Sequence, residues 1–217
     1  MQVAHFDDSI IKFKHPFTCI VAGPTNVGKT EWVLKLVQYA DSLIVPPPER
    51  IVWCYAEWQS KYNILMTNPK VVLQQGLPSK EELKSTNVPQ LLVLDNMMDT
   101  MKNDKQLIEL FIKGCHHWNI SCLHICQSLF FSGLRTLRIN AHYFVLLKSP
   151  ADKLQITTLA RQMFPGQSKL FLQAYNEATA IQYGYFIVDC NPECEEKFRL
   201  RSNIFPTDRV TTFWVIE

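Results

Sequence analysis

The sequence lacks any apolar run long enough to cross a membrane. The longest runs, such as Leu91–Leu94, hold only a few residues, whereas a membrane-spanning helix needs about 20. The N-terminal segment carries acids at Asp7 and Asp8, where a secretory signal peptide carries basic residues. We therefore expect an intracellular protein with no signal peptide, no transmembrane segment and no membrane partner.

Glycine is also scarce, at 7 of 217 residues, and no stretch has the composition of a flexible linker. Hydrophobic residues make up 47% of the chain and charged residues 19%, a balance typical of an ordered globular protein. This length suits one hydrophobic core. We therefore expect residues 1–217 to form a single domain.

The chain also lacks a large excess of positive or negative residues. The net charge of +2 neither requires nor excludes nucleic acid, because a basic stripe can occupy one face of a near-neutral protein. Four of the seven cysteines lie in apolar, strand-like runs: Cys19, Cys54, Cys122 and Cys126. Such thiols behave as small buried hydrophobes. Cys190 and Cys194 form at most half of a zinc site, since no second pair stands at ligand spacing.

Short apolar runs alternate with helical patterns along the chain. Strands are predicted at 17–22, 50–55, 91–95, 119–126, 143–147 and 185–188, and helices at 31–40, 107–113, 153–163 and 168–178. Residues 56–89 are predicted to hold a short helix and surface loops. The alternation predicts an α/β fold with a mostly parallel central sheet and helices on both faces. Ligands of such sheets bind at the carboxyl ends of the strands.

A phosphate-binding loop follows the first predicted strand. It matches Gly-x-x-x-x-Gly-Lys-Thr in full, through Gly23, Pro24, Thr25, Asn26, Val27, Gly28, Lys29 and Thr30. Glycine at both ends permits backbone angles that other residues avoid, so that consecutive N–H groups can surround phosphate oxygens. Lys29 is expected to reach the β- and γ-phosphates of ATP, and the Thr30 hydroxyl to bind Mg²⁺.

The strand at 91–95 ends in Asp95, which we expect to hold the same Mg²⁺ through water. Another predicted strand, 50–55, separates it in the chain from the phosphate-binding loop. Asn96 comes next, where related ATPases place an acid that activates water. An amide can orient water but cannot take its proton. Asp99, Glu31 and Glu57 are other candidates for the base.

Gln127 ends the fourth predicted strand, where a polar side chain can touch the γ-phosphate. Arg135 and Arg138 follow it, and either can serve as an arginine finger toward a neighbouring subunit's nucleotide. We assign Asn96, Gln127 and Arg135 as the catalytic candidates, with a solvated basic loop as the alternative for the arginines.

Together these segments resemble the virus-type DNA-packaging ATPases of the FtsK/HerA class, in particular those of Polinton or Maverick transposons and adintoviruses. The likeness covers about residues 16–206. Beyond the motifs above, it includes Tyr55–Gln59 with Tyr62, Gly76–Pro78, His116–Ser121, Gln127–Phe130, Asn140–Tyr143, Leu159–Gln162, Gly184–Tyr185 and Arg199–Pro206.

The resemblance implies a homo-oligomeric ring around double-stranded DNA, with ATP between neighbouring subunits and Arg135 supplied by the next one. Hydrolysis would drive DNA into a capsid, with capsid or portal-vertex proteins as partners. The protein would then act at the site of virus assembly, in the host nucleus or cytoplasm, or in the virion. We expect the basic residues Lys102, Lys105 and Arg209 to lie in loops. No sequence pattern identifies them as DNA contacts.

Three departures from the family leave alternatives open. Asn96 replaces the usual acid, Gln127-Ser128 replaces a Gln-Asn pair, and Ala151 stands where an arginine is common. One alternative is a nucleotide-binding ring component with little hydrolysis, as a decayed or structural copy. Another is a P-loop kinase, which the strand between the phosphate loop and Asp95, together with Gln127, disfavours.

Overall fold

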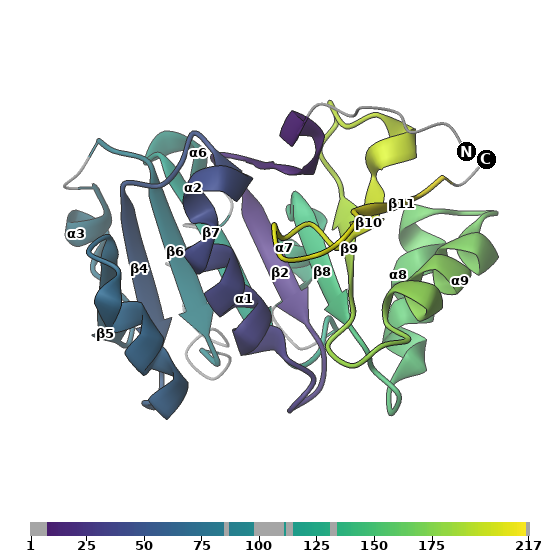
Figure 1. The fold of residues 1–217 in the computed structure, drawn as a ribbon, viewed down its shortest axis with the longest axis horizontal. Helices are drawn as coiled ribbons and strands as arrows, with labels where there is room; N and C mark the ends of the chain where they lie inside the picture. Colours follow the sequence, from purple (N-terminus) through teal and green to yellow (C-terminus); the bar gives the residue numbers. More distant parts are fainter. Residues whose placement is uncertain (1–7, 85–86, 98–110, 112–114, 131–133, 216–217) are drawn as a thin grey trace.

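The computed structural model describes residues 8–84, 87–97, 111, 115–130 and 134–215. Its centre is a nine-stranded sheet in the order β11-β10-β9-β8-β2-β7-β6-β4-β5 (Figure 1). Six neighbouring strands are parallel: β8 (Tyr143–Leu147), β2 (Thr18–Ala22), β7 (Ile120–Cys126), β6 (Gln90–Asp95), β4 (Arg50–Tyr55) and β5 (Val71–Gln75). Three antiparallel strands extend the β8 side: β9 (Tyr185–Asp189), β10 (Leu200–Ser202) and β11 (Thr212–Trp214). The predicted α/β architecture is confirmed.

Helices cover both faces of this sheet (Figure 1). The longer ones are α1 (Lys29–Gln38), α8 (Lys153–Met163) and α9 (Ser168–Ala178). The shorter ones are α2 (Ala40–Leu43), α3 (Lys80–Lys84), α6 (Cys115–His117), α7 (Leu134–Ile139) and the 3₁₀ segments η1 (Asp8–Ile11), η2 (Ser60–Thr67) and η4 (Glu196–Phe198). A separate two-stranded ribbon pairs β1 (Phe13–Lys14) with β3 (Ile44–Val45). In the described part of the chain, no helix is long and apolar enough to cross a membrane.

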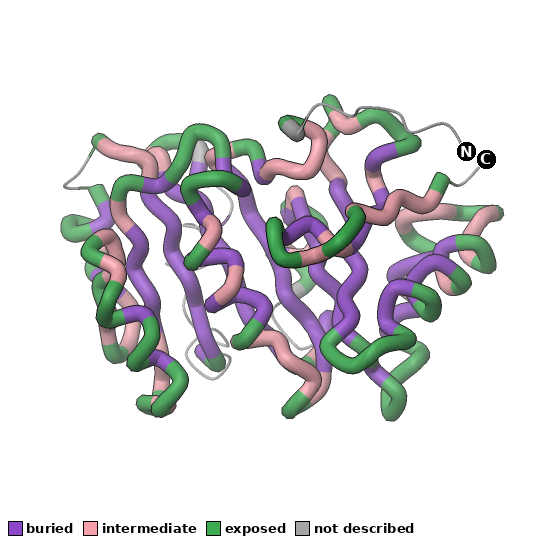
Figure 2. The backbone as a smooth tube through the Cα atoms, in the orientation of Figure 1, coloured by how far each residue is buried: buried purple, intermediate pink, exposed green. Residues whose placement is uncertain are grey.

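The central strands of the sheet are buried along their length (Figure 2), and their side chains divide alternately between two cores. Cys19 and Val21 of β2 pack in the core beneath α1, whereas Ile20 and Ala22 pack in the core beneath α8 and α9. Successive side chains of a strand point to opposite faces. The central strands are therefore apolar throughout because both of their faces are covered.

Most predicted elements lie within two residues of the observed ones, but the segment 56–89 contains more than the short helix and loops expected. It forms η2, α3 and the parallel edge strand β5. Strand β5 is only partly buried, so it lacks the continuous apolar run that marked the central strands. The antiparallel strands β10 and β11 were also not predicted. The helix predicted at 107–113 lies outside the described residues, Phe111 excepted.

Candidate nucleotide-binding site

The phosphate-binding loop connects the central strand β2 to the first turn of α1. Asn26 and Gly28 both have left-handed backbone angles, with φ values of 65° and 100°. The first bond of the helix runs from the Trp32 N–H to the Gly28 carbonyl oxygen, at 2.9 Å. The N–H groups at the start of α1 have no helical partners, so this end of the helix favours an anion.

The two glycines of the loop have different roles, which corrects the sequence interpretation. Gly28 adopts the expected left-handed angle, but Gly23 does not. A Cβ on Gly23 would lie 2.9 Å from Cγ2 of Val27 and 3.1 Å from Cβ of Leu147. Glycine is therefore required at position 23 by close packing between the loop and β8, rather than by backbone angle.

Lys29 lies inside the loop. Its ammonium donates a hydrogen bond of 2.7 Å to the Pro24 carbonyl oxygen. Burial lowers the pKa of Lys29, and the nearby Asp95 carboxylate acts in the opposite direction. The ammonium group is thus held against the loop, beside the cavity that Lys29 lines.

Asp95 is the buried acid of the site, with 3% of its surface exposed. The Tyr62 hydroxyl donates to its Oδ2 at 2.9 Å. Burial raises the pKa of the Asp95 carboxyl, while the hydroxyls of Tyr62 and Thr30 and the ammonium groups of Lys61 and Lys29 lower it. Carboxylate and hydroxyl oxygens are the ligands that Mg²⁺ prefers. Thr30 and Asp95 therefore fit the magnesium role expected of them.

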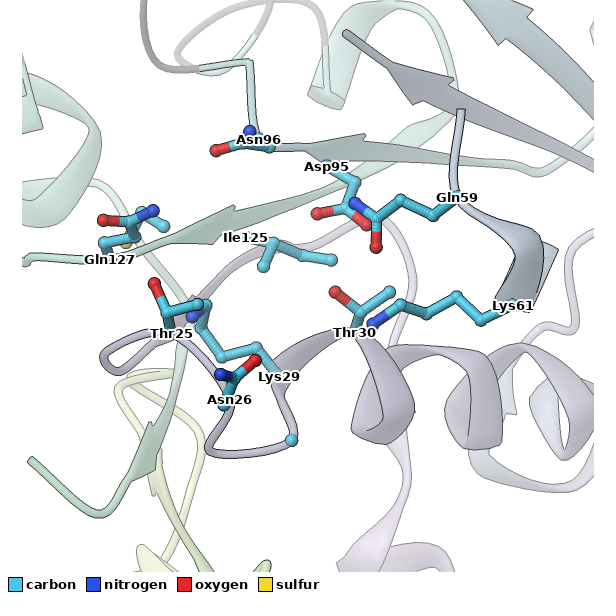
Figure 3. Close-up of a pocket in the computed structure, with 12 residues that line it drawn as sticks. Thr25, Asn26, Lys29, Thr30, Gln59, Lys61, Asp95, Asn96, Ile125 and Gln127 are labelled. Atoms are coloured by element: carbon cyan, nitrogen blue, oxygen red, sulfur yellow. The ribbon is translucent and has the colours of Figure 1, made fainter. Parts of the chain in front are cut away.

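Strand register explains why residues far apart in the chain meet here. Strand β7 pairs with β2 on one side and β6 on the other, with Cys126 opposite Ala22 and Ile125 opposite Asp95. All three strands end at the same edge. A cavity of about 200 Å³ opens there, lined by Thr25, Asn26, Gly28, Lys29, Thr30, Gln59, Lys61, Asp95, Asn96, Ile125, Cys126 and Gln127 (Figure 3). In space, the strand between β2 and β6 is β7, which delivers Gln127, whereas β4 lies beyond β6.

Asn96 and Gln127 both line this cavity, as predicted from the strand ends. Asn96 has a φ of 56°, an angle that asparagine tolerates better than most residues. The alternative bases are less well placed. Neither Glu31 nor Glu57 lines the cavity, and Glu31 lies 3.7 Å from the Lys61 ammonium. Asp99 lies outside the described residues.

Lys61 and Gln59 were not assigned from the sequence, yet both line the cavity from the segment after β4. In Figure 3 the Lys61 side chain points toward Thr30. The likeness over Tyr55–Gln59 and Tyr62 marked this segment without giving it a role. Tyr62 anchors the segment through its bond to Asp95.

The arginine candidates lie outside the cavity. Arg138 donates to the Leu129 carbonyl oxygen at 3.1 Å, and its guanidinium lies 4.0 Å from the centre of the Phe130 ring. Arg135 is exposed on α7 and does not line the nucleotide cavity of its own chain. Ala151 is exposed just before α8, whose N-cap is Asp152. Arg209 is exposed, whereas Lys102 and Lys105 lie outside the described residues.

The fold and cavity define a P-loop NTPase architecture, and comparisons with solved structures agree. The chain is similar to B204, the DNA-packaging ATPase of Sulfolobus turreted icosahedral virus, with a TM-score of 0.58 at 12% identity over 82% of this chain and 95% of that one. It is equally similar to the genome-packaging NTPase B204 of Sulfolobus turreted icosahedral virus 2 in complex with ATP-gammaS, with a TM-score of 0.58 at 11% identity over 81% and 93%.

A third similar structure is the cytoplasmic domain of the type VII secretion ATPase EccC from Thermomonospora curvata. Its TM-score is 0.51 at 12% identity, over 92% of this chain and 25% of that one. No protein-family profile and no curated protein sequence matches this chain. At these identities the comparisons establish the P-loop NTPase fold.

Proposed function

We propose that this protein is a magnesium-dependent ATPase that drives double-stranded DNA into a capsid. The observation that carries the proposal is the single cavity that joins the phosphate-binding loop to Asp95 and Gln127. Its shape and charge suit a triphosphate, because Lys29 and the start of α1 supply positive potential. The structural likeness to two viral packaging NTPases supports the choice of DNA as the load.

Each residue has a distinct task in this proposal. Lys29 and the loop N–H groups hold the β- and γ-phosphates, and Thr30 and Asp95 hold Mg²⁺, which would neutralise charge on the transferred phosphate. Gln127 and Asn96 orient the attacking water at the γ-phosphate. The subunits form a homo-oligomeric ring, in which the exposed Arg135 of one subunit faces the nucleotide of the next. The ring binds capsid or portal-vertex proteins at the site of virus assembly. As part of this proposal, we infer that the protein is a packaging ATPase of the Polinton or adintovirus type.

A second candidate is a nucleotide-binding ring component with little turnover. It is favoured by Asn96, an amide in the cavity where a carboxylate would accept a proton. A P-loop kinase is less well supported, because β7 separates the phosphate-loop strand from the strand that ends in Asp95.

Steady-state ATP hydrolysis, with and without double-stranded DNA, tests the proposal. We expect DNA-stimulated turnover that requires Mg²⁺. The Lys29→Ala variant should lose both this turnover and tight nucleotide binding. Lys70→Ala is the matched control, since Lys70 pairs with Asp41 on the surface and its loss leaves the cradle intact. Tight binding without turnover would favour the second candidate, and unchanged affinity in Lys29→Ala would overturn the nucleotide site itself.

A further inference from the structure

A second cavity, of about 350 Å³, lies on the other flank of the phosphate-binding loop. It is lined by Asn26 and Val27 of the loop, by Lys148 and by residues 180–184. Lys148 directly follows β8, and residues 180–184 connect α9 to β9. Both segments therefore meet the loop at the edge of the sheet where the parallel strands end (Figure 1).

The sheet order fixes which part of a nucleotide faces this cavity. Asp95 and Gln127 lie on the β6 and β7 side of β2, so the γ-phosphate end of a bound triphosphate points to that side. The nucleoside end must leave the loop in the opposite direction, toward β8 and β9. The cavity beside Asn26 and Val27 is on that path, and Asn26 lines both this cavity and the one that holds Lys29 and Asp95.

Tyr183 is the large aromatic side chain of this cavity. Its ring packs directly on Gly28, because a Cβ added to Gly28 would lie 2.8 Å from Cδ1 of Tyr183. The residue is nevertheless 61% exposed, so much of the ring remains open to a ligand.

The backbone of Tyr183 has a φ of 61°, which is uncommon for an aromatic residue and costs free energy. Its neighbours hold it in place. The Gly184 N–H donates to the Ile181 carbonyl oxygen at 3.1 Å, and a Cβ on Gly184 would collide with the Ala178 carbonyl oxygen. Next along the chain, the Tyr185 hydroxyl donates to Asp208 at 3.0 Å. The ring is thus presented on a fixed, strained turn.

We propose that Tyr183 is the stacking platform for the purine base of the bound nucleotide, with Lys148 at the edge of the same subsite. The proposal rests on the function proposed above, because the phosphates must occupy the cradle for the base to arrive here. Flat aromatic surfaces stack on any base, so the ring supplies affinity. The polar groups of Asn26, Gln182 and Lys148 are the ones available to read the base edge.

The test compares ligands with and without a base. Equilibrium binding of ATP, ADP and inorganic triphosphate is measured on the full chain and on Tyr183→Ala. We expect ATP and ADP to bind about tenfold more weakly in the variant, as for loss of one base–aromatic stack, while inorganic triphosphate binds unchanged. Tyr183→Phe and Tyr183→Trp keep the ring and should keep nucleotide affinity. Leu154→Ala, which removes an exposed apolar side chain on α8, is the matched control.

Two results would overturn the platform. An equal loss of affinity for triphosphate and ATP in Tyr183→Ala would make the ring a support of the loop at Gly28. A Tyr183→Phe variant as weak as Tyr183→Ala would assign the effect to the hydroxyl instead of to stacking. Failure of the proposed nucleotide site gives a different result, because the unmodified protein would then bind neither triphosphate nor ATP. Failure of turnover alone leaves this comparison of binding affinities intact.

Discussion

Two lysines reach the cavity at the carboxyl edge of the sheet, and they enter it from different directions. Lys29 comes from the loop beneath the phosphates, whereas Lys61 comes from the segment after β4 and lies among Thr30, Asp95 and Gln127 as a lining residue. In the proposed site Asp95 and Gln127 face the γ-phosphate, and Lys61 would then contact the terminal phosphate. It supplies a second cation to the cavity from within the same subunit.

We therefore expect Lys61→Ala to weaken ATP binding about tenfold and to leave ADP binding within about twofold, since a hydrogen bond to a charged group is lost only with the triphosphate. Competition binding with both nucleotides measures the difference, with Lys70→Ala as the surface control. Equal losses for ATP and ADP would contradict a contact with the γ-phosphate.

Asn96 carries the second prediction at this scale. Asn96→Asp should raise ATP turnover about tenfold or more, because a positioned carboxylate can take the proton of the attacking water. Aspartate also tolerates the left-handed backbone of this position. Asn96→Ala, which offers no acceptor, should give no gain. Steady-state hydrolysis measures both variants, and equal rates in Asn96→Asp and the unmodified protein would assign water activation to another group.

The sequence was sufficient to predict which residues meet at one cavity where a contiguous motif or a strand end marks them. Lys29, Thr30, Asp95, Asn96 and Gln127 all line the predicted cavity. The packing role of Gly23 was not predictable, because it depends on Leu147, which approaches only across the sheet. Lys61 and Tyr183 were also not predicted. Both lie in segments between regular elements, and no motif marks a side chain that approaches the loop from such a segment.

At the scale of the elements, the parallel strand β7, next to the central strand β2, contains an unusual buried residue. His124 is fully buried between β2 and β6, and neither of its ring nitrogens has a hydrogen-bond partner among the described residues. Burial lowers its pKa to about 4. As the pH falls below about 6.5, the unfolded chain takes up a proton at this position, whereas the folded protein does not until about pH 4.

Stability should therefore fall as the pH is lowered. His124 alone should remove about 2 kcal/mol of unfolding free energy between pH 7 and pH 5, and His15, whose pKa burial also lowers, acts in the same direction. Urea unfolding at several pH values measures this. His124→Leu should show a shallower pH dependence than the unmodified protein, whereas the exposed control His117→Leu should not. Parallel curves for His124→Leu and the unmodified protein would contradict this role of the histidine.

The elements themselves were predictable in proportion to their burial. Strands β4 and β8 and helices α8 and α9 have the predicted bounds, because covered faces impose clear apolar patterns. The edge strands β5 and β11 carry weaker patterns because they are only partly buried, and this explains why they were missed. Strand β10 is buried, but it has only three residues, and two of them, Arg201 and Ser202, are polar, so no apolar run marked it.

At the scale of the whole molecule, the proposed ring makes the active site a property of two subunits. Arg135→Ala should lower turnover without weakening ATP binding, because the arginine would act on the nucleotide of the neighbouring subunit. Mixing Arg135→Ala with Lys29→Ala should then restore part of the turnover, since some interfaces join an intact cradle to an intact arginine. Hydrolysis assays on mixed subunits measure this, with the exposed Arg161→Ala as the control that keeps full activity. Mixtures no more active than their parts would leave Arg135 without a role in trans.

The central position of β2 has a consequence for how the protein is made. The neighbours of β2 in the described sheet are β7 and β8, and 104 residues separate Phe17 from its hydrogen-bond partner Ser121. On a ribosome, the strand that supports the cradle therefore emerges long before any strand that can pair with it. Its apolar faces and unpaired backbone edges stay open until β7 has been made, as is typical of folds dominated by distant contacts. A nascent chain that stops before β7 has the complete phosphate-loop motif but neither of the strands that pair with β2.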